Sequence, residues 1–376
     1  MNFSQTLSKY NKKRIFDGNV KSNKKPLKKE YDYFIIIPSY AEKLYINNTL
    51  LTINYQDKSL LKQSLIVIVI NNSTDDDQSI IKNNQDTYKI IYKDKFNFEF
   101  IIIDCFSKNY VLDPKIAGVG TARKIGMDYC IGYAKQSSLF CCVDADTLLS
   151  KDYLSIVSKE YQEYHYNAAV VGFKHQRSED KKIQKAIIKY ESLLKSIAKN
   201  IKATGSPYGF VSMGSTMVCT MEAYILIGGM PQKKATEDFY FLQQLAKYDS
   251  IHVIDKILVH PSPRPEQRVY LGTGFRMKNI KNDILFSDLY INKEAYDALK
   301  IFYTIIEKKW DFKSTEIMSS IVKNNIKLKG YLKSNNFAKT LDQIQKNSIN
   351  KKQLLDQFHR WFDNLKIYKF LKLYGD

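Results

Sequence analysis

Short apolar runs, each ended by a polar residue or a turn residue, are the feature that most limits what this chain can fold into. The runs are continuous instead of alternating, and they cover residues 33–37, 65–70, 98–103, 139–143 and 168–171. Strands with this pattern are covered on both faces of a sheet. Stretches with helical spacing lie between them, at residues 45–55, 121–134 and 151–164. This alternation predicts an α/β fold with a mostly parallel, doubly wound sheet flanked by helices.

The residues that end these runs indicate where chemistry takes place. In doubly wound sheets, ligands bind beyond the carboxyl ends of the strands. The five runs stop at Pro38, Asn71, Asp104, Asp144 and Gly172. We therefore expect these residues at one edge of the sheet, and we expect the functional site there.

Two carboxylates, Asp144 and Asp146, directly follow the fourth run. Side chains at i and i+2 on a turn can converge on one cation, and their oxygens favour Mg²⁺ or Mn²⁺. Such a cation can neutralise a diphosphate leaving group. Most Asp-x-Asp tripeptides are surface turns, but the position after a buried strand favours a metal site here.

Five short motifs, in order over roughly residues 31–275, resemble those of family 2 glycosyltransferases, which have the GT-A fold. Each motif is weak alone, and the common order and spacing make the resemblance specific. The motifs are Pro38-Ser39-Tyr40-Ala41-Glu42, Asn71-Asn72-Ser73-Thr74-Asp75, the helix start Gly118 to Gly126, Asp144-Ala145-Asp146, and Glu237-Asp238.

The resemblance implies which residues hold a nucleotide-sugar donor. The segment with Pro38, Tyr40 and Glu42 would flank the nucleoside pocket, and the turn at Asn71 would approach the base. Arg123 would lie near the donor, at a helix start that also favours anions. The family has Asp where this chain has Asn71, which leaves the identity of the base open.

The resemblance also implies a metal site. Asp144 would lie near the ribose and the metal, and Asp146 would bind the metal directly. In several GT-A enzymes a histidine near the position of His260 completes the metal shell, and a neutral imidazole suits Mn²⁺ better than Mg²⁺. A lone histidine is more often structural, so that alternative stays open for His260.

A second acidic pair, Glu237-Asp238, would supply catalysis. The resemblance implies that Asp238 is the general base for the acceptor hydroxyl, a role that needs a carboxylate free of the metal. Acidic residues at the start of a helix are also good caps, and this interpretation stays open.

A basic segment near residue 270 is the other candidate for donor binding. It contains Arg264, Arg268 and Arg276 beside Gly272-Thr273-Gly274. The arginines could hold the donor diphosphate or an acidic acceptor. A surface loop paired with local acids is an equal alternative.

The positive charge lies at the two ends of the chain. The net charge is +19, and residues 1–30 hold nine Lys or Arg against two Asp or Glu. Residues 293–376 hold seventeen against nine. Basic ends suit an anionic surface, either membrane phospholipid or nucleic acid, and a solvated Lys-rich surface is an equal alternative. The stretch from Gln353 to Leu373 has aromatic residues that could anchor it in a membrane, although that apolar face could instead pack on protein.

The domain organisation follows from these patterns. We expect a flexible basic tail over residues 1–30, a GT-A domain over 31–292, and a helical region over 293–376. The N-terminus lacks the apolar stretch of a secretory signal. The five cysteines are scattered and suit buried, reduced thiols. We therefore expect a cytoplasmic location, with peripheral contact at the inner face of the membrane.

We interpret the chain as a non-processive glycosyltransferase, because the Gln-x-x-Arg-Trp signature of processive synthases is missing. It would move a sugar from a nucleotide-diphosphate sugar, with UDP-sugars favoured, to a hydroxyl of a glycan or glycolipid. Inversion is expected, and retention stays open. The alternatives are a sugar nucleotidylyltransferase and a non-catalytic basic protein that binds membrane or nucleic acid. Nucleic acid is not an expected partner, because Tyr and Lys are interspersed without an RNA-binding signature.

Overall fold

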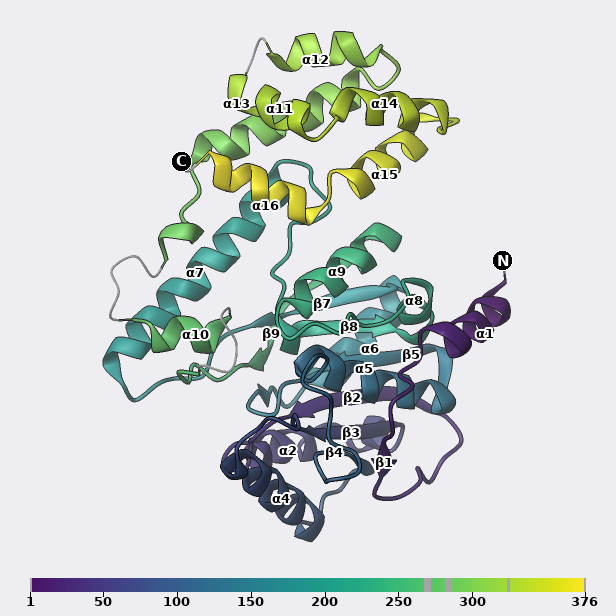
Figure 1. Ribbon diagram of the computed structural model, residues 1–376, viewed down its shortest axis with the longest axis vertical. Coiled ribbons are helices and arrows are strands. Elements are labelled where there is room, and N and C mark those ends of the chain that lie inside the picture. The colour runs from purple at the N-terminus through teal and green to yellow at the C-terminus, as the bar shows by residue number, and fades with distance from the viewer. Residues whose placement is uncertain (1, 267–271, 281–285, 323–324, 375–376) are drawn as a thin grey trace. The chain divides into compact units, whose positions relative to one another are not determined.

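The computed structural model describes residues 2–266, 272–280, 286–322 and 325–374 (Figure 1). It contains two compact units, one formed by residues 1–188 with 212–280 and the other by residues 189–211 with 281–376. The first unit contains the sheet, and the second is helical.

One mixed sheet of nine strands runs through the described part of the first unit, in the order β1-β4-β3-β2-β5-β8-β7-β9-β6. The strands are Lys21–Ser22 (β1), Tyr31–Ser39 (β2), Ser64–Asn71 (β3), Phe100–Cys105 (β4), Ala134–Cys142 (β5), Leu148–Leu149 (β6), Ala168–Phe173 (β7), Met217–Thr220 (β8) and Ile251–His260 (β9).

The central strands β4, β3, β2 and β5 are parallel neighbours, as the apolar runs predict. Their side chains form the core because both faces are covered; Ile35, Ile68 and Phe140, for example, are 0% exposed. The predicted α/β class is confirmed. The short strand β8 lies outside the five apolar runs, and it joins β5 and β7 by antiparallel pairing. The four residues of β8 are too few to show a periodic pattern of apolar residues.

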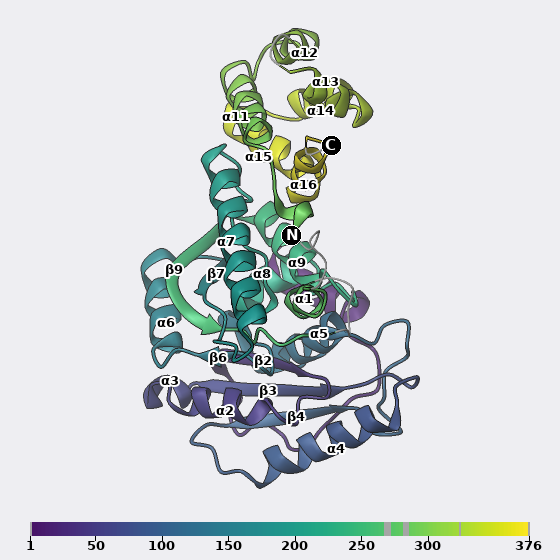
Figure 2. The same ribbon diagram turned by 90° about the vertical axis from the view of Figure 1, so that its left-hand side faces the viewer.

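Helices of the first unit cover the sheet, and α2 and α4 lie side by side (Figures 1 and 2). Helix α5 packs on β2 and β3, where a side chain at Gly126 would meet Ile36 and Val69. The helices are Phe3–Lys13 (α1), Ile46–Asn54 (α2), Lys58–Leu61 (α3), Gln78–Lys93 (α4), Val119–Cys130 (α5), Tyr153–Tyr164 (α6), Met221–Leu226 (α8), Glu237–Tyr248 (α9) and Thr273–Lys278 (α10), with 3₁₀ turns at Ile131–Tyr133 and Gly214–Thr216. Helix α7, Lys181–Ala203, begins in the first unit and ends in the second.

The N-terminal segment differs from the flexible tail expected for residues 1–30. It contains α1 and β1, and Tyr10 of α1 is 2% exposed. The Tyr10 hydroxyl donates to Asp128 Oδ1 at 2.7 Å, and the Phe16 amide donates to Asp128 Oδ2 at 2.7 Å. The composition of the segment does not predict this order, because a single buried aromatic residue and one distant carboxylate anchor a helix whose other residues are not buried.

The second unit packs its helices around aromatic side chains. The helices after α7 are Lys293–Lys308 (α11), Ser314–Val322 (α12), Ile326–Ser334 (α13), Phe337–Lys346 (α14), Lys351–Trp361 (α15) and Asn364–Leu373 (α16), with a 3₁₀ turn at Ser287–Leu289. Phe302, Phe337, Phe358 and Phe362 are at most 1% exposed and contact one another. Over the described residues, the helices are too short or too polar to cross a bilayer.

The five cysteines are all buried and free, as expected from the sequence. Burial raises the pKa of the Cys141 and Cys142 thiols to about 12, which keeps them protonated at neutral pH.

Candidate active site

The parallel register brings the predicted motifs to one edge of the sheet. Ile36 of β2 pairs with Cys142 of β5, and Ser39 of β2 pairs with Ile70 of β3. The segments that follow these pairs therefore leave the sheet at the same edge, the carboxyl ends of the parallel strands. As a result, Glu42, Asn71 and the Asp144–Asp146 turn are close in space although they are far apart in the sequence.

Arg123 lies between the motifs that meet at this edge of the sheet. It lies in α5 and is 2% exposed, and its guanidinium donates from Nη2 to Asp144 Oδ1 and from Nη1 to Glu237 Oε1. Burial alone would lower the pKa of Arg123, but the carboxylates of Asp144 and Glu237 raise it. The arginine is therefore a fixed cation that joins the Asp-x-Asp turn to the Glu-Asp pair.

The packing around Arg123 leaves no room for larger neighbours. A side chain at Gly214 would collide with the Arg123 guanidinium, and a side chain at Gly120 would collide with the carbonyl oxygens of Pro231 and Lys233. These two glycines let the segments before β8 and before α9 approach the arginine closely.

Asp144 is held from two sides. Its Oδ1 accepts from Arg123, and its Oδ2 accepts from the Ser215 hydroxyl at 2.5 Å. Ser215 also shares a hydrogen bond of 2.9 Å with Thr147. The Asp144 side chain is still 33% exposed, so its carboxylate stays within reach of a ligand.

Glu237 and Asp238 begin α9 and face different surroundings. Glu237 is 4% exposed and bound to Arg123, and burial raises its pKa to about 7 against the opposing effect of that cation. Asp238 is partly exposed, and its Oδ1 accepts from the Phe239 amide at 2.7 Å. Burial also raises the pKa of Asp238. A carboxylate with a raised pKa, next to a fixed cation, suits proton transfer near neutral pH.

Arg264 links the β2 end to the Asp-x-Asp turn. Its Nη2 donates to Glu42 Oε1, and its Nε lies 3.0 Å from Asp146 Oδ2. The guanidinium carbon stacks over the Tyr45 ring at 4.2 Å from the centroid. Burial alone would lower the pKa of Arg264, but Asp146 and Glu42 raise it. This geometry places a second cation beside Asp146.

Residues of the turn after β3 and of helix α4 form hydrogen bonds that hold the predicted nucleoside segment, residues 38–42. The Tyr40 hydroxyl donates to Asp76 Oδ1 at 2.7 Å. Asn84 of α4 accepts from the Ala41 amide at 2.9 Å and donates to the Asn71 carbonyl at 3.0 Å. Pro38 and Asn71 are buried. Hydrogen bonds to the buried Asn84 thus link the segment at residues 38–42 to the turn at Asn71.

Two acidic residues of the site follow a residue in the left-handed backbone region. Ala41 has φ 57° and precedes Glu42, and Thr236 has φ 64° and precedes Glu237. Such conformations cost roughly 1–3 kcal/mol in non-glycine residues and are concentrated at functional sites. The strain supports the assignment of both turns to the site.

His260 ends β9, opposite Leu148 of β6. Its Nδ1 lies 2.9 Å from the Lys174 carbonyl oxygen, and its Nε2 lies 3.3 Å from the Ser150 hydroxyl. The structure therefore gives both ring nitrogens protein partners and does not group His260 with the two aspartates.

His260→Ala tests these two interpretations of the histidine. We expect the metal titration of activity to stay unchanged and the free energy of unfolding to fall by about 1–2 kcal/mol, because two hydrogen bonds are lost. Thermal unfolding and activity against Mn²⁺ concentration would measure both. A rise in the metal concentration that gives half-maximal activity would instead assign His260 to the metal shell.

The residues present fit a divalent cation that is shared with a ligand. Within the described residues, no three His, Cys, Asp or Glu side chains group closely enough to hold an ion alone. Mg²⁺ and similar ions are often bound by one or two carboxylates plus substrate phosphates and water. The partly exposed carboxylates of Asp144 and Asp146 provide such a set.

Some site residues differ from the sequence prediction. Arg268 lies outside the described residues. Ser215, Tyr45 and Asp76 were not predicted, although they contact Asp144, Arg264 and Tyr40. Ser215 lies in the 3₁₀ turn before β8, and none of these three residues carries a spacing signal in the sequence.

Comparisons with known proteins found a family model and solved structures to which the chain is similar. Residues 34–218 match the family model described as Glycosyl transferase family 2. Among solved structures, the chain is similar to S. aureus TarS 1-349 in complex with UDP-GlcNAc, with 15% identity, a TM-score of 0.45, and coverage of 88% of this chain and 91% of that chain. It is also similar to the mannosyltransferase PcManGT from Pyrobaculum calidifontis in complex with GDP-Man and Mn²⁺, with 15% identity, a TM-score of 0.41, and coverage of 95% of each chain. No curated protein matches the chain.

Proposed function

We propose that this chain is a non-processive, metal-assisted glycosyltransferase that uses a nucleotide-diphosphate sugar, and the match of residues 34–218 to the family 2 model supports the proposal. UDP-sugars are the first candidates for the donor, and a hydroxyl of a glycan or lipid-linked glycan is the acceptor. The observation that carries the proposal is the buried Arg123, which joins Asp144 to Glu237 beside the partly exposed Asp238.

Asp238 is the proposed general base. It takes the proton of the acceptor hydroxyl while the hydroxyl oxygen attacks the anomeric carbon and the bond to the nucleoside diphosphate breaks. Attack opposite the leaving group inverts the anomeric centre. The raised pKa of Asp238 brings its proton affinity nearer to neutral pH, which improves general-base catalysis.

Glu237 is proposed as a positioning residue. Its carboxylate holds Arg123 from the side opposite Asp144, so the guanidinium cannot swing away from the Asp-x-Asp turn. A charged group fixed by two partners needs little reorganisation during the reaction. Glu237 therefore acts through Arg123 and not on the acceptor.

The leaving group is proposed to lie between Asp146 and Arg264. Asp144 and Asp146 would hold a divalent cation, Mn²⁺ or Mg²⁺, which when bound neutralises charge on the departing diphosphate. Arg264 would donate to phosphate oxygens, because a guanidinium binds them in a fixed fork. Glu42 keeps that arginine in place when Asp146 is engaged elsewhere.

Thermal unfolding with nucleoside diphosphates tests the donor site. We expect UDP, GDP or CDP to stabilise the protein only when Mn²⁺ or Mg²⁺ is present, by about 2.7 kcal/mol at 100 times the dissociation constant. Asp146→Ala should abolish the metal-dependent part, whereas Asp297→Ala, at an exposed aspartate of the second unit, should not change it. Equal stabilisation with and without metal would contradict the metal-bridged donor site.

A further inference from the structure

The second unit has an open groove between α13 and α16, and we propose that it docks on an anionic phospholipid membrane by taking up an acyl chain. This inference goes beyond the glycosyl transfer proposed above and does not depend on its chemistry. The groove has a volume of about 610 Å³, and it is lined by Ile326, Lys327, Gly330, Tyr331, Ser334 and Leu373.

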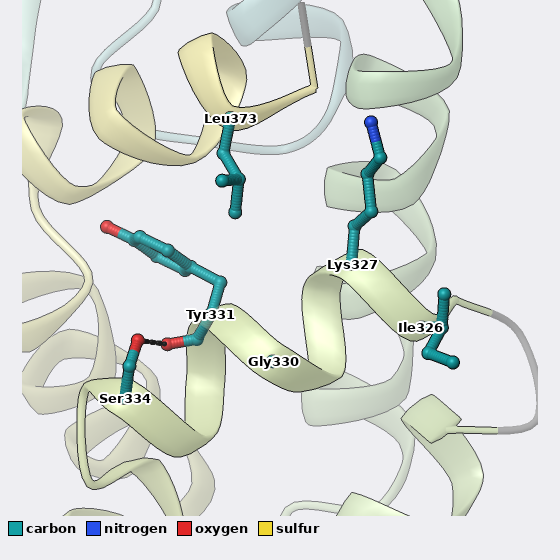
Figure 3. Close-up of a pocket in the computed structure, with 6 residues that line it drawn as sticks. All are labelled: Ile326, Lys327, Gly330, Tyr331, Ser334 and Leu373. Carbon is teal, nitrogen blue, oxygen red and sulfur yellow. Dashed lines mark hydrogen bonds between the residues drawn. The ribbon is translucent and has the colours of Figure 1, made fainter. Parts of the chain in front are cut away.

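The interior of the groove offers few polar partners to a ligand. The Tyr331 hydroxyl donates to the Lys366 carbonyl oxygen at 2.8 Å, and the Ser334 hydroxyl donates to the Tyr331 carbonyl oxygen at 2.9 Å. Figure 3 shows the Tyr331 ring and the Leu373 side chain extending toward each other from α13 and α16. Because the hydroxyls are already bonded, the part of a ligand that enters is apolar.

The helices that form the groove carry positive charge only. Neither α13 nor α16 contains Asp or Glu, and each contains three lysines. These lysines are Lys327, Lys329, Lys333, Lys366, Lys369 and Lys372. A groove bordered only by positive charges complements the anionic headgroups of a membrane, because each basic residue near the surface adds electrostatic attraction.

Exposed apolar side chains at the groove favour a membrane over other polyanions as the partner. Ile326 is 82% exposed and Leu373 is 41% exposed, and both lie among the lysines. A nucleic acid would use the lysines and leave these side chains in water, whereas a lipid surface takes up both.

This surface replaces the one suggested by the sequence. The aromatic face from Gln353 to Leu373 was expected either to lie in a membrane or to pack on protein. In the structure Phe358, Phe362 and Phe370 are at most 1% exposed, in contact with other helices of the second unit. The groove beside them is open and carries exposed apolar side chains that a membrane can contact.

Co-sedimentation of the full chain with vesicles tests the proposal. We expect binding to vesicles of phosphatidylcholine and phosphatidylglycerol in equal parts, reversed by salt, and none to phosphatidylcholine alone. The double variant Lys327→Gln with Lys372→Gln should bind about 30-fold more weakly, since each lysine contributes a factor of about 5. Leu373→Gln should weaken binding by about 10-fold through the lost apolar burial.

A matched pair of variants separates the groove from net charge. Lys346→Gln with Lys352→Gln removes the same charge from exposed lysines near the α14–α15 turn, which lies at the far end of this unit from the start of α13 (Figure 1). This control should bind like the wild type, and circular dichroism would verify that all variants are folded. Equal losses in both pairs, no binding to anionic vesicles at low salt, or a groove-dependent affinity for nucleic acid without one for vesicles would overturn the proposal.

Discussion

Asp238→Asn should leave donor binding unchanged and lower kcat by about 10²-fold or more, the usual scale for a lost general base. The amide keeps the size of the side chain and its hydrogen bond from the Phe239 amide, but it cannot accept the acceptor proton. Donor binding would be measured by thermal shift with a nucleoside diphosphate and metal, and kcat by release of the nucleoside diphosphate.

A distant aspartate provides the control for this substitution. Asp255 is exposed on β9, so Asp255→Asn should change neither kcat nor donor binding. If Asp238→Asn weakened donor binding as strongly as turnover, Asp238 would belong to the donor site and the base assignment would be incorrect.

Arg123→Leu should lower the free energy of unfolding by about 3–5 kcal/mol, the cost of leaving a buried charge without its partner. Two carboxylates, those of Asp144 and Glu237, lose their shared cation, and Glu237 is only 4% exposed. Donor binding should fall as well, because Asp144 loses one of its two fixed contacts. Chemical denaturation and the thermal-shift assay would measure the two effects.

The double variant Arg123→Leu with Glu237→Leu tests the cause of that loss. Replacing a buried ion pair by apolar groups is often neutral, so this variant should recover much of the stability while activity stays low. A double variant that is as unstable as the single one would show that the cost comes from packing around Gly214 and not from unpaired charge.

Much of the fold could be predicted because it depends on local sequence. The apolar runs 33–37, 65–70 and 139–143 are long enough to identify β2, β3 and β5 without any tertiary information. The position of Asp144 after such a run predicted the edge of the sheet at which the structure places this residue. Local patterns do not show partners, however, and the contacts of this site join distant segments.

The contacts that hold the site together are long-range. Arg264 and Glu42 are 222 residues apart, and Arg123 and Glu237 are 114 apart. The sequence assigned the members of these pairs to donor binding or catalysis but gave no means of pairing them. Ser215 was missed for the same reason, since its hydroxyl gains a role only where the fold brings it to Asp144.

Order at the N-terminus was missed for a related reason. Residues 1–30 have the basic, polar composition of a tail, and their order depends on contacts such as that between Tyr10 and the buried Asp128. Asp128 also accepts from the Tyr224 hydroxyl and pairs with Lys124. A composition averaged over thirty residues cannot detect a single anchoring side chain.

The central claim is that this chain transfers a sugar from a nucleotide-diphosphate donor at the Asp144–Asp146 edge, and a donor screen tests it most directly. The purified chain would be given UDP-, GDP- and CDP-sugars in turn, with and without Mn²⁺, and release of the nucleoside diphosphate would be measured. We predict metal-dependent release from one nucleotide class, lost in Asp146→Ala and retained in Asp297→Ala. Release that persists in Asp146→Ala, or no release from any donor when glycan and lipid-linked acceptors are supplied, would contradict the claim.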